Sequence, residues 1–230
     1  MQSKVLDGKW SPEQLSKRLE FEKSDLSIGF NTIYRAIHQG WLDISEGKAS
    51  RKLRHKGRTR RRKNHLEKRG KITISHTLEE RPISAQNRSR FEHWEADTVL
   101  GVAGDACLLT LTERKSRFEL VKKIAGKKAL LVKEAMITLL TPHKLRSITP
   151  DRGKEFAKHS LVTQTLGAAF YFPEPHQPWQ RGTNENTNGL LREFFPKQQD
   201  INRWSDDYIQ SVVDKLNLRP RKYLGWKTPY

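Results

Sequence analysis

The chain has 230 residues and a formal net charge of +18, with 44 Lys and Arg against 26 Asp and Glu. This excess of positive charge indicates a polyanionic partner; nucleic acid is the first candidate and an anionic membrane surface the second. The one cysteine, Cys107, excludes an intramolecular disulfide and argues against a cysteine-based zinc site. No apolar run approaches the ~18 residues that span a bilayer, and no secretory leader follows Met1. The sequence therefore predicts a cytoplasmic protein that faces nucleic acid.

Two helices are predicted near the N-terminus. The first begins at a capping box formed by Ser11 and Gln14. The second runs from about residue 30 to residue 39, with polar side chains outside its apolar face, among them Asn31 and Arg35. Two short helices with a tight connection fit a helix-turn-helix, whose second helix would enter the major groove of DNA. An ordinary helical hairpin is the alternative.

A strongly basic run follows these helices. Residues 51–71 carry twelve basic side chains and one acid, a net charge of +11. Its densest part contains Arg58, Arg60, Arg61, Arg62 and Lys63. Such a run cannot bury enough apolar surface to fold alone. It is either a solvated linker or an arm that lies along phosphates, and we favour the arm because the run joins two segments with features of nucleic-acid-binding proteins.

From about residue 84 the pattern becomes that of a mixed α/β domain. Strands are predicted at 94–100, 106–112, 117–124, 146–149 and 168–172. Helices are predicted at 127–141, 155–166, 182–195 and 205–216. The order of these elements predicts a five-stranded sheet with helices packed on it.

Three acids stand out in this domain. Asp97 lies within the first predicted strand, Asp151 lies just past the carboxyl end of the fourth, and Glu185 lies in the first turn of a helix. The first and fourth strands are expected to be neighbours, which would bring Asp97 and Asp151 together. Converging carboxylates repel one another unless cations neutralise them, and oxygen ligands select Mg²⁺ or Mn²⁺. Two such ions can activate an attacking oxygen and stabilise a leaving oxygen in phosphoryl transfer.

Each acid also has a structural alternative. Asp97 could pair with Arg114 or Arg117 on a neighbouring strand. Asp151 could cap a turn, and Glu185 could simply favour the helix dipole. The three acids considered together on this topology favour a metal site.

The segments around these acids resemble a known family. Residues 94–97, 148–156 and 178–189 resemble the DDE transposases of bacterial insertion sequences, most closely the insertion-sequence-30 family. That family separates its second acid from its glutamate by 33 residues, and 33 residues lie between Asp151 and Glu185 here. The resemblance covers nearly the whole chain, including the predicted helix-turn-helix.

The resemblance implies a ribonuclease H-like fold of the retroviral-integrase type. It implies that Asp97, Asp151 and Glu185 are catalytic and hold two Mg²⁺ or Mn²⁺ ions during strand cleavage and strand transfer. It also implies double-stranded DNA partners, namely element ends and target, and a homo-oligomer. Related transposases carry an arginine four residues before the glutamate, matched here by Arg181, and a lysine seven residues after it, where this chain has Arg192. A core ion pair is the alternative role for Arg192.

We therefore predict three parts: a helix-turn-helix segment at 1–45, a basic linker at 46–83 and a ribonuclease H-like catalytic domain at 84–230. The expected function is that of a DNA transposase acting in the bacterial nucleoid. Relatives usually extend further at both ends, so the chain resembles a truncated product. The alternative function is a non-catalytic DNA-binding protein that competes with the intact transposase. A ribonuclease acting on RNA–DNA hybrids is disfavoured, because A-form grooves do not admit a reading helix.

Overall fold

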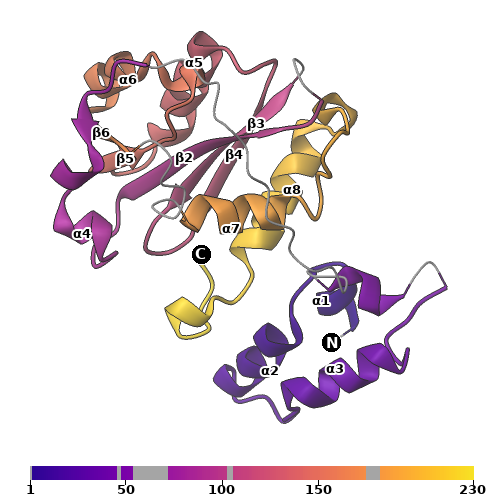
Figure 1. Cartoon of the computed structure of the whole chain (residues 1–230). Coiled ribbons are helices and arrows are strands. Elements are labelled where there is room, and N and C mark those ends of the chain that lie inside the picture. Colours follow the sequence, from indigo (N-terminus) through magenta and orange to yellow (C-terminus); the bar gives the residue numbers. More distant parts are fainter. Residues whose placement is uncertain (1, 46–47, 54–71, 103–105, 175–181) are drawn as a thin grey trace. The chain divides into compact units, whose positions relative to one another are not determined.

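The computed structural model describes residues 2–45, 48–53, 72–102, 106–174 and 182–230. It divides into two compact units (Figure 1). The first comprises residues 1–66 and 215–230, and the second comprises residues 67–214. The predicted domain boundaries stay a prediction. The basic side chains singled out at residues 58 and 60–63 lie outside the described residues.

The first unit is helical. It contains α1 (Gln2–Leu6), α2 (Pro12–Phe21), α3 (Phe30–His38) and two 3₁₀ turns, η1 (Ala49–Lys52) and η6 (Lys222–Leu224). The capping box is confirmed, because the Gln14 amide donates to Ser11 Oγ at 3.2 Å and the Ser11 amide donates to Gln14 Oε1 at 2.9 Å. Its small apolar core consists of Val5, Trp10, Leu15, Ile33, Ile37 and Ala49.

Two features of this unit differ from the sequence expectation. The connection between α2 and α3 spans residues 22–29, which is longer than the three to four residues of a tight helix-turn-helix connection. The chain's last residues also belong to this unit. Buried Arg219 donates to the Gly8 carbonyl at 3.0 Å, and Gln14 Nε2 donates to the Pro220 carbonyl at 2.9 Å.

The second unit is built on a mixed sheet with the strand order β1-β6-β5-β2-β3-β4. The strands are β1 (His76–Thr77), β2 (His93–Leu100), β3 (Cys107–Glu113), β4 (Glu119–Ile124), β5 (Ser147–Thr149) and β6 (Ala169–Phe172). β3 pairs antiparallel with β2 and β4, whereas the other pairings are parallel. The sheet therefore has six strands in the described residues, not five, because β1 forms within the predicted linker and pairs with β6.

Helices cover both faces of this sheet (Figure 1). α5 (Ala129–Leu140) and α6 (His159–Leu166) pack on one face, and α7 (Gly182–Leu191) and α8 (Asp206–Asn217) lie on the other. The shorter elements are η2 (Leu78–Glu80), α4 (Ile83–Gln86), η3 (Lys154–Phe156) and η5 (Ile201–Arg203). The predicted helix at 155–166 is divided into η3 and α6. No helix in the described part of the chain combines the length and apolarity of a membrane span.

Candidate active site

The strand pairing brings two of the predicted acids to the same end of the sheet. β2 and β5 are parallel neighbours, with Glu95 opposite Thr149. Asp97 lies two residues beyond Glu95, and Asp151 lies two residues beyond Thr149. The two acids therefore follow equivalent positions on adjacent strands, and paired strands are about 4.8 Å apart. The expectation that these strands are neighbours is confirmed.

Asp97 is partly buried and held by α7. Its Oδ2 accepts a hydrogen bond from Asn188 Nδ2 at 3.0 Å, and its Oδ1 accepts one from the Thr98 amide at 2.7 Å. The other end of the Asn188 amide accepts from Thr110 Oγ1 at 3.3 Å. These contacts fix both the orientation of the Asn188 amide and the position of the Asp97 carboxylate.

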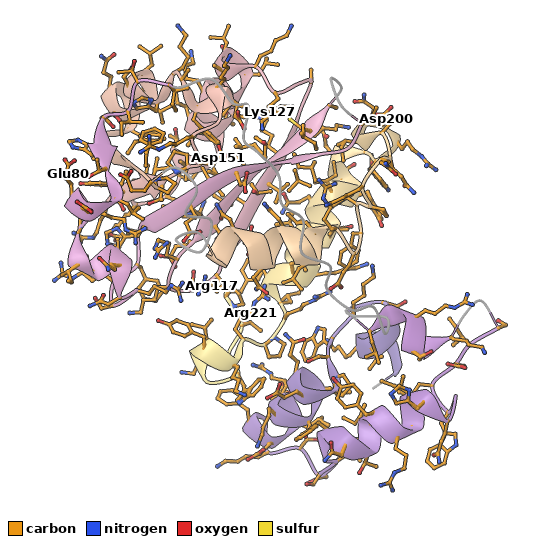
Figure 2. The ribbon with its side chains drawn as sticks, viewed as in Figure 1. Glu80, Arg117, Lys127, Asp151, Asp200 and Arg221 are labelled. Atoms are coloured by element: carbon orange, nitrogen blue, oxygen red, sulfur yellow. The ribbon has the colours of Figure 1, made fainter. Side chains whose placement is uncertain are left out.

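Asp151, labelled in Figure 2, is 7 % exposed and follows the end of β5. Its Oδ1 accepts the Gly153 amide at 2.8 Å, so the turn-capping role considered above does occur. A carboxylate has about four acceptor positions on its two oxygens. The turn contact with Gly153 uses one of these positions on Asp151.

Contacts near the start of α7 attach it to β2. The Asn184 amide donates to Glu95 Oε2 at 3.2 Å, and Asn184 Nδ2 donates to the Ala96 carbonyl at 3.3 Å. With Asn188 bound to Asp97, the backbone of Glu185 lies between two anchored residues of the same helix. The side chain of Glu185 lies outside the described part of the structure, as does Arg181.

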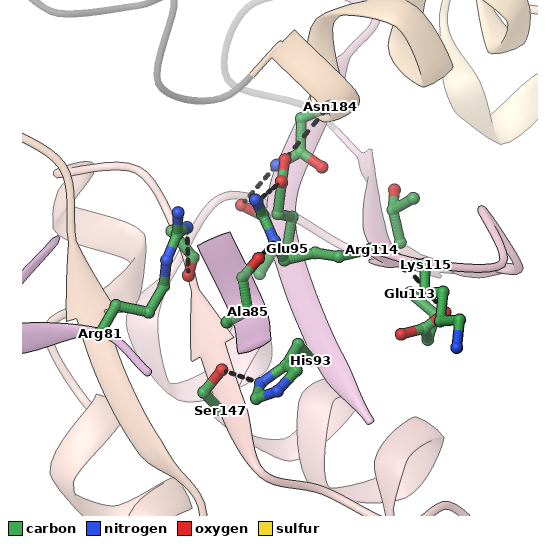
Figure 3. Close-up of polar contacts among 12 residues, drawn as sticks. Arg81, Ala85, His93, Glu95, Glu113, Arg114, Lys115, Ser147 and Asn184 are labelled. Carbon is green, nitrogen blue, oxygen red and sulfur yellow. Dashed lines mark hydrogen bonds and ion pairs between the residues drawn. The ribbon is translucent and has the colours of Figure 1, made fainter. Parts of the chain in front are cut away.

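The acceptor for the start of α7 belongs to a buried ion pair (Figure 3). Glu95 and Arg114 are both almost fully buried, and Arg114 Nη1 bonds to Glu95 Oε1. Arg114 Nε also donates to the Ala85 carbonyl at 2.8 Å. Burial, followed by the charges of neighbouring arginines, lowers the pKa of Arg114 to about 9. Arg114 thus pairs with Glu95, rather than with Asp97 as one alternative proposed.

Glu95 was not among the site residues predicted from the sequence. One signal was present: in a strand, residues two apart point to the same face, so Glu95 shares its face with Asp97. A carboxylate at the start of a helix is favoured by the helix dipole and by unpaired backbone amides. Glu95 therefore positions the helix that carries the third predicted acid.

The other predicted contact residues have varied surroundings. Arg192 is partly buried, its Nη1 donates to the Phe195 carbonyl at 3.5 Å, and burial lowers its pKa. Asn31 and Arg35 are exposed on α3. Their roles in DNA binding stay a prediction.

The carboxylates at this end of the sheet have the chemistry that a divalent cation requires. Asp97 and Asp151 supply carboxylate oxygens, which Mg²⁺ and Mn²⁺ prefer. Among the described side chains, which do not include that of Glu185, no three His, Cys, Asp or Glu residues cluster closely enough to hold a metal. The two described acids fit a hard cation in their chemistry and in their placement, with Asp97 on β2 and Asp151 just past the end of the neighbouring strand β5.

Comparisons with known proteins identify relatives along nearly the whole chain. The transposase of insertion sequence IS30A from Escherichia coli is 40% identical over 97% of this chain, which spans 61% of that relative's length. The transposase of IS1086 from Cupriavidus metallidurans is 35% identical, and this chain covers 68% of it. The transposase of IS4351 from Bacteroides fragilis is 37% identical, with 69% covered. No family model matches the sequence.

A solved structure shares the fold. The simian T-cell lymphotropic virus intasome, solved in complex with a PP2A regulatory subunit, has a chain that aligns with 72% of this chain and 58% of its own length. The TM-score is 0.51 and the sequence identity 16%. With the mixed sheet and its flanking helices, this likeness confirms the predicted ribonuclease H-like fold.

Proposed function

The chain belongs to the insertion-sequence-30 family of transposases, and we propose that it catalyses metal-dependent cleavage and strand transfer of DNA. It spans about 61% of the length of the E. coli relatives that it matches, so the activity of the whole protein is part of this proposal. The observation that carries the proposal is the attachment of α7 to β2. This attachment brings the Glu185 backbone beside the strand of Asp97, next to the strand that ends before Asp151.

We assign Asp97, Asp151 and Glu185 as the catalytic carboxylates that would hold two Mg²⁺ or Mn²⁺ ions. When bound, two such ions supply positive charge that activates an attacking oxygen and stabilises a leaving oxygen. Asn188 and Thr98 hold the Asp97 carboxylate, and Gly153 holds that of Asp151. Carboxylates fixed before substrate arrives lose little conformational freedom in the reaction.

The proposed reaction has two phosphoryl transfers. In the first, a water oxygen bonds to phosphorus at the element end, and the bond to the 3′ oxygen breaks, which frees a 3′-hydroxyl. In the second, that hydroxyl attacks a target phosphodiester in line and displaces the target's 3′ oxygen. In both steps, Asp97, Asp151 and Glu185 would hold the two ions, whose positive charge would offset the negative charge of the reacting phosphodiester.

We also propose DNA contacts away from the three acids. Asn31 and Arg35 are exposed on α3, which supports contact with base edges or phosphates. Arg181, Arg192 and the basic run at 58–63 would neutralise phosphates and make binding sensitive to salt. We propose double-stranded DNA as the partner and a homo-oligomer as the active form.

The test is cleavage of element-end DNA by the purified chain with Mg²⁺ or Mn²⁺. Asp151→Asn should abolish cleavage and leave DNA affinity within about threefold, because it removes one carboxylate but no basic side chain. Asp207→Asn, an exposed acid in α8, is the matched control and should cleave normally. Retained cleavage by Asp151→Asn would refute the assignment. DNA binding without nicking by the unaltered chain would instead favour the competing DNA-binding protein.

A further inference from the structure

Arg81, between η2 and α4, is a buried cation that has no acidic partner among the described side chains. Its exposure is 7 %, and its Nε has no hydrogen-bond partner. Its Nη1 donates to Thr149 Oγ1 at 3.5 Å, the limit of a hydrogen bond. Within the described residues, no carboxylate forms an ion pair with Arg81. A guanidinium keeps its charge, and burying a charge is costly unless the charge is paired.

The Arg81 guanidinium contacts the face and the end of the sheet that carry the acids. Thr149 is the last residue of β5 and pairs with Glu95 on β2. Side chains at paired positions share a face, and residues two apart along a strand do so as well. Thr149 therefore faces the same side as Asp97, with their Cα atoms about 8 Å apart by strand geometry. Figure 3 shows Arg81 running toward the same end of the sheet as Asn184.

Among the described residues, the charge that shifts the pKa of Arg81 is that of a neighbouring arginine. Burial, followed by the charge of Arg88, lowers the pKa of Arg81 to about 10. Arg114 also lies close enough for the two charges to interact. However, the charge of Arg114 is already met by Glu95. Arg81, Arg114 and Glu95 together therefore keep a net positive charge at the end of the sheet that carries Asp97 and Asp151. A phosphodiester bound there would bring a negative charge to Arg81.

We propose that Arg81 binds a phosphate oxygen of the DNA strand that reacts at Asp97 and Asp151. This proposal rests on the proposed function. A guanidinium can donate two parallel hydrogen bonds to a phosphate, and within the described residues the Arg81 guanidinium makes a single long hydrogen bond, to Thr149. A purely structural role, holding the segment before α4 against β5, is the alternative. That role depends on one hydrogen bond at the distance limit.

The first test uses inorganic phosphate as the probe, with ionic strength held constant by NaCl. Phosphate should raise the melting temperature of the unaltered chain by binding the folded state. Arg81→Met should keep less than half of that shift and, without phosphate, should melt at or above the temperature of the unaltered chain, because an uncompensated buried charge is gone. Arg146→Met is the matched control. Arg146 lies just before the first residue of β5, at the other end of the strand from Thr149, and its side chain is 48% exposed and pairs with Glu92. It should keep the full phosphate shift.

The second test is cleavage of element-end DNA. Arg81→Met should cleave at least tenfold more slowly while its DNA affinity changes less than threefold. An unchanged phosphate shift in Arg81→Met, with a lower melting temperature, would overturn the proposal and identify a structural arginine. Loss of the shift without any cleavage by the unaltered chain would uphold the anion site and refute the transposase function. If Arg81→Met fails to fold, Arg81→Gln serves for the same measurements.

Discussion

Replacing Arg114 with Met should destabilise the second unit strongly. The substitution leaves the Glu95 carboxylate fully buried, with the backbone amide of Asn184 as its remaining donor among the described residues. It also removes the hydrogen bond from Arg114 Nε to the Ala85 carbonyl. Breaking a buried ion pair by removing one partner typically costs about 3–5 kcal/mol. That cost is between about a fifth and the whole of the ~5–15 kcal/mol that stabilises a typical domain.

Two measurements give the loss of stability. Urea unfolding gives the free energy of unfolding, and hydrogen exchange of the β2 and β3 amides locates the loss in the sheet. The double variant Glu95→Leu with Arg114→Met removes both charges and should lie within about 2 kcal/mol of the unaltered chain, because apolar replacements of buried pairs are often nearly neutral. Arg146→Met disrupts the more exposed pair with Glu92 and should cost at most ~1 kcal/mol. A loss below about 1 kcal/mol for Arg114→Met, or a double variant as unstable as the sum of the single variants, would refute the reasoning.

Three further predictions concern stability. Burial, followed by nearby arginine charges, lowers the pKa of His93 to about 4 from 6.5; the unfolded chain then binds more protons between these values, so stability should fall by about 2–3 kcal/mol from pH 7 to 4.5. Urea titrations of a His93→Gln variant should lack this component, and an equal pH dependence in both proteins would contradict it. Ser11→Ala should cost about 1 kcal/mol in the first unit through loss of the capping box, whereas an Asp cap should preserve stability; equal thermal melting of the Ala variant would argue against the cap. Gly153→Ala would place a methyl group against the buried Glu155 carboxylate and should cost about 1–3 kcal/mol, unlike Gly126→Ala, which meets no atom within 4 Å; equal denaturation midpoints for the two variants would count against this contact.

The main strands and helices could be predicted because their signals are local. β3 reads as a continuous apolar and β-branched run from residue 107, and α2 begins at a recognisable cap. β1 has only two residues, too few for any periodicity, and it exists because β6 offers an unpaired edge. The segment after α8 joins the first unit through Arg219 and Pro220. Such long-range contacts leave no pattern in the sequence.

The candidate site was predictable in its acids but not in its supports. Asp97 could be predicted because it is a charged residue within an otherwise apolar strand, and Asp151 because it lies just past the carboxyl end of a strand. The pairing of Arg114 with Glu95 was not predicted, because a charged residue within a strand normally signals the exposed face. The burial of both residues appears only when the strands are paired. The burial of Arg81 likewise depends on the position of β5 beside the segment that precedes α4.

The central claim is that Asp97 and Asp151 jointly hold a divalent cation. Crystals of the full chain soaked in Mn²⁺ and measured for anomalous scattering of manganese test it most directly. We expect a peak about 2 Å from a carboxylate oxygen of each residue, and its loss in crystals of Asp97→Asn. Ordered crystals with no peak between these two acids, at Mn²⁺ concentrations that support cleavage, would contradict the account.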